Sequence, residues 1–168
     1  LRSPKVTLVP HAVKGLSRTG AIDANGDEHE LDIIVLATGF DAANYLGNYR
    51  VHGRGGTELH EQWQGEPEAF LGMMVPKFPN FFIMYGPNTN SIPLVSFYEA
   101  QASFAAGLIS RAASAGAGSI EVRRSAFVLY NDWVQARLSK TVWAQVNNYF
   151  KAGTGRIVSQ WPSGATPY

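Results

Sequence analysis

The sequence of 168 residues contains no cysteine. Disulfide bonds, thiolate nucleophiles and zinc sites built on cysteine are therefore excluded. The sequence also lacks an apolar run approaching the roughly 20 residues that cross a bilayer, and no signal peptide opens it. We expect from this a cytoplasmic protein, and we expect the chain to be a fragment because it opens with Leu1.

An excess of charge of one sign is missing as well. The 14 Lys and Arg residues and the 13 Asp and Glu residues are scattered and leave a net charge of +1. A nucleic acid or an anionic membrane surface requires a basic stripe, so we expect neither partner. The chain does contain 45% hydrophobic residues and many aromatic ones, which suffices for a compact domain with a core.

Several catalytic and binding motifs begin in this chain and fail. Three G-x-G pairs lack the third glycine of a dinucleotide-binding fingerprint. They begin at Gly53, Gly116 and Gly153. Residues 60–64 (HEQWQ) start like the zinc motif H-E-x-x-H but have Gln64 at the second histidine position, so no metal site is expected. Glu58 and Glu61 are spaced to share a helix face and are interpreted as a solvated surface.

The apolar pattern predicts a mixed α/β chain that begins with strands. We expect strands at 6–9, in a hairpin that turns at Asn25-Gly26, at 33–37 and at 81–85. Asn-Gly suits the positive φ angles of a type I′ turn. The continuously apolar run at 33–37 is typical of a strand buried on both faces of a parallel sheet.

The best predicted helix covers residues 96–115. Ser96 and Glu99 have the spacing of a capping box, and Gly116 stands where a helix-ending glycine belongs. Its predicted buried face comprises Phe97, Ala100, Phe104, Leu108 and Ala112. A second helix is expected over 126–139, and residues 58–64 have the length of one or two helical turns.

We therefore divide the chain into four parts. Residues 1–36 form a β-meander and the buried strand, and 37–95 form a linker with small-residue turns. Residues 96–140 form the helical part, and the aromatic and glycine-rich residues 141–168 form a tail that lies over other structure.

Two predicted strands run directly into small residues. Thr38 and Gly39 follow the strand at 33–37, and residues 86–89 (GPNT) follow the strand at 81–85. The carboxyl ends of strands in α/β sheets are where ligands bind, and small residues let the backbone come close to them. Either segment alone is also compatible with an ordinary tight turn, but together they favour a ligand site.

These segments resemble class B flavoprotein monooxygenases, the family of Baeyer–Villiger and flavin-containing monooxygenases. Residues 32–40 (DIIVLATGF) resemble the family's A-T-G segment, and residues 75–89 (VPKFPNFFIMYGPNT) resemble its more specific V-P…Y-G-P-N-T block. Further matches are Trp63, AFLG at 69–72, Glu99 and Gln101, TVW at 141–143, GR at 155–156 and WP at 161–162. The match covers essentially the whole chain in the family's order and is interpreted as its carboxy-terminal portion.

The sequence departs from the family pattern at identifiable positions. Lys77 replaces the usual glycine after Val-Pro, and Pro76 occupies the histidine position of the F-x-G-x-x-x-H fingerprint. Asn148-Tyr149 stands where the family often has Ser-Trp. Because that tryptophan contacts the nicotinamide cofactor in the family, the resemblance implies that Tyr149 is the corresponding NADP contact.

The resemblance implies the carboxy-terminal part of an FAD-binding Rossmann-like domain, followed by two helices and the tail. It also implies a chemistry in which NADPH reduces FAD, O₂ adds at the flavin C4a atom, and the peroxyflavin inserts one oxygen atom into a ketone. Oxidation of an N or S centre is the alternative chemistry, and a stand-alone interaction domain without catalysis is the alternative class.

The resemblance implies as well which partners the chain has. Both glycine-rich fingerprints and the active-site arginine lie upstream of the matching segment in the family. The chain by itself is therefore expected to be inactive and apo. We expect as partners the missing amino-terminal FAD- and NADPH-binding part and an apolar small-molecule substrate, with a homodimer as the outcome if apolar surface stays uncovered.

Site residues follow from the match position by position. Thr38 and Gly39 correspond to the junction of the FAD and NADPH domains. The turn near the ring end of FAD corresponds to Gly86, Pro87, Asn88 and Thr89. There a backbone N–H or the Asn88 amide would meet the pyrimidine edge of the flavin.

The residues after this turn are expected to line the substrate cavity. They are Ile92, Leu94 and Phe97, which would form a mostly apolar surface. Ordinary core packing is the alternative for Leu94 and Phe97. The resemblance assigns no catalytic residue to this chain.

Overall fold

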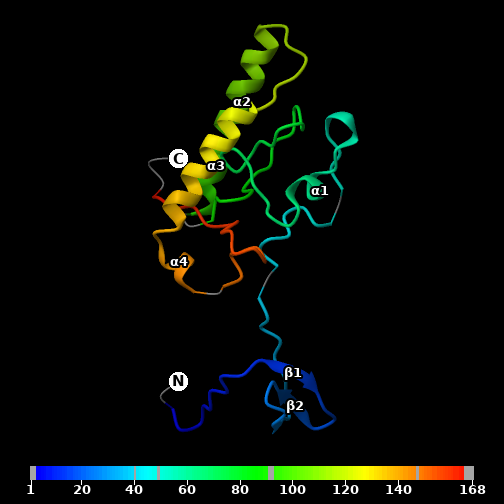
Figure 1. The fold of residues 1–168 in the computed structure, drawn as a ribbon, viewed down its shortest axis with the longest axis vertical. Coiled ribbons are helices and arrows are strands. Elements are labelled where there is room, and N and C mark those ends of the chain that lie inside the picture. Colours follow the sequence, from blue (N-terminus) through cyan, green and yellow to red (C-terminus); the bar gives the residue numbers. More distant parts are fainter. Residues whose placement is uncertain (1–2, 40, 49, 91–92, 147, 165–168) are drawn as a thin grey trace. The chain divides into compact units, whose positions relative to one another are not determined.

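The computed structural model forms two compact units, Leu1–Gly39 and Phe40–Tyr168. It describes residues 3–39, 41–48, 50–90, 93–146 and 148–164. The three strands lie in the first unit, and all the helices lie in the second (Figure 1).

The first unit is an antiparallel β-meander. Its strands are β1 (Val13–Leu16), β2 (Gly20–Asp23) and β3 (Glu28–Glu30), paired in the order β1-β2-β3. The hairpin predicted around Asn25 is confirmed, but its loop spans 24–27 and only Gly26 has a positive φ, of 92°. The type I′ turn is therefore wrong, because that turn needs two such residues. The buried Asp23 carboxylate closes the loop by accepting from the N–H groups of Asn25 and Asp27.

The predicted strands at 6–9, 33–37 and 81–85 are wrong, since none of them is a strand in the structure. Ile33, Val35 and Leu36 are 80%, 82% and 79% exposed. A strand buried on both faces needs paired neighbours at its edges and helices over its faces. The part of the chain that the structure describes supplies neither to residues 33–37, so the run stays uncovered.

The second unit is built from helices and irregular segments. Its helices are the 3₁₀ turn η1 (Arg54–Gly56), α1 (Leu59–Trp63), α2 (Leu94–Ser114), α3 (Arg124–Leu138) and α4 (Val142–Gln145). The predictions of a short helix near 58–64 and of a helix over 126–139 are confirmed. Phe127, Val134 and Leu138 of α3 are buried, as their spacing indicates.

Helix α2 differs from its prediction at the beginning and agrees at the end. It begins at Leu94 after Pro93, so Ser96 lies inside the first turn and makes no capping bond. At the end, Gly116 has a φ of 63°, and the N–H of Ala117 donates to the carbonyl of Ala112. This bond closes a Schellman motif.

The buried face predicted for α2 is only partly formed. Of its described residues only Phe97 and Gln101 are buried, and Phe104 is 36% exposed. A helix of 21 residues that buries two side chains leaves an apolar surface without cover.

Three apolar clusters form the core of the second unit. The first joins α1 to the segment 69–83 and comprises Leu59, Trp63, Ala69, Val75, Phe78 and Ile83. The second joins α2, α3 and the tail and comprises Phe97, Val134, Leu138, Ile157 and Trp161. The third comprises Met73, Met74, Val122 and Phe127. The described part of the tail thus contributes Ile157 and Trp161 to the core.

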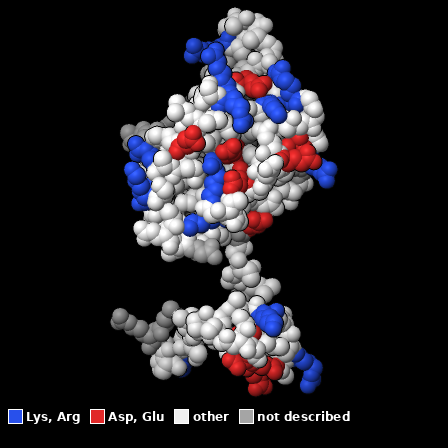
Figure 2. Space-filling model, viewed as in Figure 1, with Lys and Arg blue, Asp and Glu red and all other residues white. Residues whose placement is uncertain are grey.

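None of the helices that the structure describes is long and apolar enough to cross a bilayer. Figure 2 shows Lys and Arg side chains interspersed with Asp and Glu on the visible face of the larger unit. This mixture matches the balanced charge of the sequence.

Candidate functional site

The turn at 86–89 is packed inside the second unit. Gly86, Pro87, Asn88 and Thr89 are all buried, and the hydroxyl of Thr89 donates to the Gly86 carbonyl at 2.7 Å. A Cβ added to Gly86 would lie 2.3 Å from the carbonyl oxygen of Gly72. The glycine at this position therefore permits close approach to the neighbouring turn of the same chain.

Gln101 of α2 braces this turn. Its side chain is fully buried, and its Oε1 accepts from the Tyr85 N–H at 2.8 Å. Its Nε2 donates to the Leu71 carbonyl at 3.0 Å. The sequence comparison marked Gln101 only as part of an E-x-Q match, and its bridging role required the tertiary structure.

The tail also binds the turn through its backbone. The Asn88 N–H donates to the Val158 carbonyl at 2.9 Å, and the Asn90 N–H donates to the Ser159 carbonyl at 2.8 Å. The Trp161 N–H returns a bond to the Asn90 carbonyl at 2.8 Å. Asn90 and Gln160 thereby form a parallel β-bridge.

The other predicted site residues lie in different environments. Phe97 is fully buried and packs edge-on against Tyr85 and Trp161, with ring centroids 6.0 and 6.3 Å away. Leu94 is 43% exposed, and Ile92 lies outside the described residues. Tyr149 is 58% exposed and lies against Phe150 with a centroid distance of 4.1 Å.

Thr38 and Gly39 belong to the first unit and are exposed. Gly39 has a φ of 81°, and no atom lies within 4 Å of the point where a Cβ would stand. This segment is therefore open to a ligand or to further polypeptide. The structure brings together residues 86–89, Phe97 and the tail, and it holds Thr38 and Gly39 in a separate unit.

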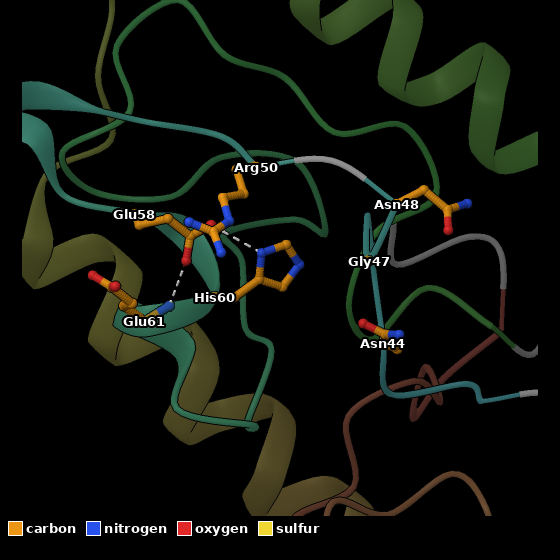
Figure 3. Close-up of a pocket in the computed structure, with 7 residues that line it drawn as sticks. All are labelled: Asn44, Gly47, Asn48, Arg50, Glu58, His60 and Glu61. Carbon is orange, nitrogen blue, oxygen red and sulfur yellow. Dashed lines mark hydrogen bonds and ion pairs between the residues drawn. The ribbon is translucent and has the colours of Figure 1, made fainter.

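A polar pocket of about 650 Å³ lies at the amino-terminal side of α1 (Figure 3). Its lining residues are Asn44, Gly47, Asn48, Arg50, Glu58, His60 and Glu61. Figure 3 shows Glu58, His60 and Glu61 on and just before α1, with the His60 ring toward the segment that carries Asn44 and Asn48 and the Glu61 carboxylate directed away from it. The sequence marked residues 60–64 only as a failed zinc motif, so the pocket was not predicted.

His60 is held between two acceptors. Its Nδ1 lies 3.0 Å from the Glu58 Oε1, and its Nε2 lies 2.9 Å from the Tyr45 carbonyl oxygen. Both ring nitrogens must donate to satisfy these partners, and only the imidazolium form can do so. The hydrogen bond that His60 donates to Glu58 accordingly raises the pKa of His60, against the opposing effect of partial burial.

Glu58 is buried, which corrects its interpretation as solvated surface. Its Oε2 accepts from the Glu61 N–H at 2.9 Å and so caps α1, while its other oxygen faces His60. The hydrogen bond with His60 is the main cause that lowers the pKa of Glu58 to about 2. Glu58 thus holds the His60 ring at the start of α1, and the bond from His60 to the Tyr45 carbonyl ties Tyr45 to the same place.

The pocket is a mixed-charge surface with no metal-binding geometry. Among the described residues, no three His, Asp or Glu side chains come together to hold a metal ion. The pocket carries the cations Arg50 and His60 opposite the carboxylates Glu58 and Glu61. The pocket therefore presents both positive and negative groups to a polar ligand and favours neither anions nor cations.

No family model matches the chain. The chain is 35% identical to the FAD-binding monooxygenase ktnD of Aspergillus niger, over 100% of its own length and 29% of that protein. It is 30% identical to a Baeyer-Villiger monooxygenase of Pseudomonas aeruginosa, over 96% of its own length and 32% of that protein. The chain thus spans about a third of the length of the curated relatives it matches.

The solved structures agree. The crystal structure of cyclohexanone monooxygenase from Rhodococcus sp. Phi1 bound to NADP+ matches 94% of this chain with a TM-score of 0.79 and 26% identity. The chain covers 31% of that protein. The predicted resemblance to flavoprotein monooxygenases is confirmed by these relatives.

Proposed function

Because the chain is homologous to a part of FAD-binding and Baeyer-Villiger monooxygenases, we propose that it is the carboxy-terminal portion of such an enzyme. The complete enzyme would use NADPH and FAD to insert one oxygen atom from O₂ into a ketone. In this proposal the chain completes an FAD-binding Rossmann-like domain. Its own residues shape the flavin and substrate side of the site, and residues outside it hold most of each cofactor.

The uncovered apolar run at 33–36 is the observation that carries this proposal. Ile33, Val35 and Leu36 are about four-fifths exposed, whereas the second unit buries its core residues almost completely. Their composition is that of a strand inside a covered sheet. Such a run gains stability only when further strands and helices cover it, and the two-thirds of the relatives that the chain does not span offer that cover.

The chain fits a flavin at two segments in different ways. Thr38 and Gly39 present an exposed backbone with open space beside Gly39. The residues of the turn at 86–89 are buried within the chain itself. The turn would therefore contact a cofactor through its backbone and through the half-buried Asn90. Bound FAD would supply the oxygen activation, and the protein would supply orientation and exclusion of water.

The substrate side is apolar. Leu94 and Val95 at the start of α2 are 43% and 65% exposed, and they follow directly on the turn and on Ile92. We place the substrate-lining surface here, with Phe97 beneath it as a buried support. Tyr149, exposed on the tail, is the proposed nicotinamide contact.

A direct test compares the 168-residue chain with a longer protein that contains it. We expect the chain alone to bind FAD weakly and to leave NADPH unoxidised, because it lacks a glycine turn and helix N-terminus for the pyrophosphate. The longer protein should convert a cyclic ketone to a lactone. Stoichiometric yellow flavin and NADPH turnover by the chain alone would overturn the division of labour proposed here.

An N- or S-oxidising enzyme is the second candidate. Its flavin chemistry is the same, and the substrate decides the product. Supplying the longer protein with a ketone, an amine and a thioether separates the two. An N- or S-oxide without any ester or lactone would reject the Baeyer–Villiger reaction.

A further inference from the structure

We infer that Asn88 is a positioning residue that fixes the register of the tail on the 86–89 turn. The turn's place beside a flavin rests on the proposed function, but the register role of Asn88 does not. Its carboxamide is 1% exposed, and its Nδ2 donates to the carbonyls of Ile157 at 2.9 Å and Gln160 at 3.0 Å. Both hydrogens of the amide are thus engaged with the tail.

The spacing of the two acceptors makes this contact specific. Ile157 and Gln160 are three residues apart, so the single amide group of Asn88 binds the tail at two points. The bridge between Asn90 and Gln160 lies alongside. Residues 157–161 are all buried, so a slip of one residue would place each of their side chains against the wrong neighbours. Trp161, which is 2% exposed, would then lose its edge-on contact with Phe97.

The burial of apolar side chains stabilises the packing of the tail on the second unit but does not specify its register. Ile157, Val158 and Trp161 are buried, and burial of such side chains stabilises by about 1.5–3 kcal/mol each. This contribution depends on area and is not directional. The directional bonds are the three backbone bonds between turn and tail, the two bonds of the Asn88 amide, and one bond from the Gln135 Nε2 of α3 to the Ile157 carbonyl at 2.9 Å. Backbone N–H and carbonyl groups recur at every residue, so the side-chain bonds are the ones that distinguish one register from another.

The backbone at Asn88 is suited to this role. Its φ is 58°, a left-handed conformation in which asparagine is enriched among the non-glycine residues. Asn88→Gly therefore removes both donors without adding backbone strain. Asn88→Asp keeps the shape and places a carboxylate oxygen against two carbonyl oxygens.

The test is amide hydrogen exchange on the 168-residue chain, read by NMR. In Asn88→Gly the backbone N–H groups of Asn90 and Trp161, which bond across the turn and tail, should exchange about tenfold faster or more. The N–H groups within α3 should keep their rates. Gln135→Ala is the matched control, because it removes one bond to the same Ile157 carbonyl and leaves the grip on Gln160; it should produce a smaller change.

Two outcomes overturn the inference. One is unchanged exchange at Asn90 and Trp161 in the glycine variant; the other is equal acceleration throughout α3, which marks general destabilisation. If the variants do not fold, the parent chain decides. There the Asn88 side-chain NH₂ should exchange much more slowly than that of the exposed Asn25. Equal rates would reject the role of Asn88 whether or not the chain serves a flavin enzyme.

Discussion

At the scale of single residues, the pair of Glu58 and His60 shows how one contact gives a chain segment a pH-dependent anchor. The imidazolium joins the start of α1 to the Tyr45 carbonyl, and the carboxylate caps the helix at the same time. Arg50 and Glu61 line the same pocket and add one charge of each sign. His60 loses its positive charge as the pH rises, and Glu58 loses its negative charge as the pH falls. These two residues therefore set the upper and lower pH limits within which the contact is intact.

The anchor should make stability depend on pH at both ends. The pKa of His60 is raised above its ordinary value of 6.5, so its contribution is complete below pH 6.5 and is lost as the pH rises through the folded pKa. The pKa of Glu58 is lowered from 4.5 to about 2, so its contribution is complete above pH 4.5 and is lost towards pH 2. Urea unfolding from pH 5 to 9 should show the upper loss.

His60→Gln should remove the decline above pH 6.5, and His11→Gln in the first unit should leave it in place. The neutral amide cannot change its charge in this range. An identical slope in the His60 variant and the parent chain would show that other groups cause the decline.

The approach of two turns at Gly72 gives a second prediction at this scale. Gly72 has a φ of 61°, and an added Cβ would lie 2.2 Å from the Thr89 Cγ2 atom. Gly72→Ala should lower the free energy of unfolding by about 2–4 kcal/mol, from left-handed strain and overpacking together. Gly107→Ala in α2, where nothing lies within 4 Å, should raise it by about 0.5–1 kcal/mol. Chemical denaturation measures both, and a neutral Gly72 variant would contradict the packing described.

At the scale of elements, the end of a helix depends on residues close in the sequence, whereas a strand depends on pairing with a distant segment. The end of α2 forms as predicted because Gly116 satisfies the last carbonyls within the helix itself. The run at 33–37 does not form a strand, although its apolar composition favours one. A strand acquires its hydrogen bonds only from another strand.

This difference predicts the effect of charge in the run at 33–36. A double substitution of Ile33→Lys and Val35→Lys should leave the free energy of unfolding of the chain within about 0.5 kcal/mol of the parent, because both side chains are exposed. The same variant should reduce self-association, since an uncovered apolar run associates with apolar surface on other copies. Light scattering and urea unfolding check the two parts.

Leu138→Lys provides the contrasting control, because this side chain is fully buried in α3 and its loss should unfold the second unit. A large destabilisation by the Ile33 and Val35 substitutions would show instead that residues 33–36 are buried in the isolated chain.

At the scale of the whole molecule, the chain consists of a small β-unit and a larger helical unit. A unit of fewer than 40 residues is marginal by itself, because little of its surface can be buried. The second unit contains all three apolar clusters. The two units should therefore differ in stability.

We expect the two units to unfold in separate transitions. Residues 41–168 expressed alone should keep the unfolding midpoint that tryptophan fluorescence reports for the whole chain, since all four Trp residues lie in the second unit. Circular dichroism of the whole chain should detect the first unit losing its strands at lower denaturant. A midpoint that falls when residues 1–40 are removed would show that the units stabilise each other.

The sequence by itself determined the family, the absence of cysteine chemistry, the hairpin, and the positions of α1, α3 and the end of α2. These depend on residue identity and on interactions within a few positions of the chain. Tertiary structure decided that Asn88 grips the tail, that Glu58 is buried with His60, and that residues 33–37 remain exposed. Each of these depends on partners brought together, or not supplied, by the folding of distant segments. Neither the periodicity of apolar residues nor a local sequence motif can specify such partners.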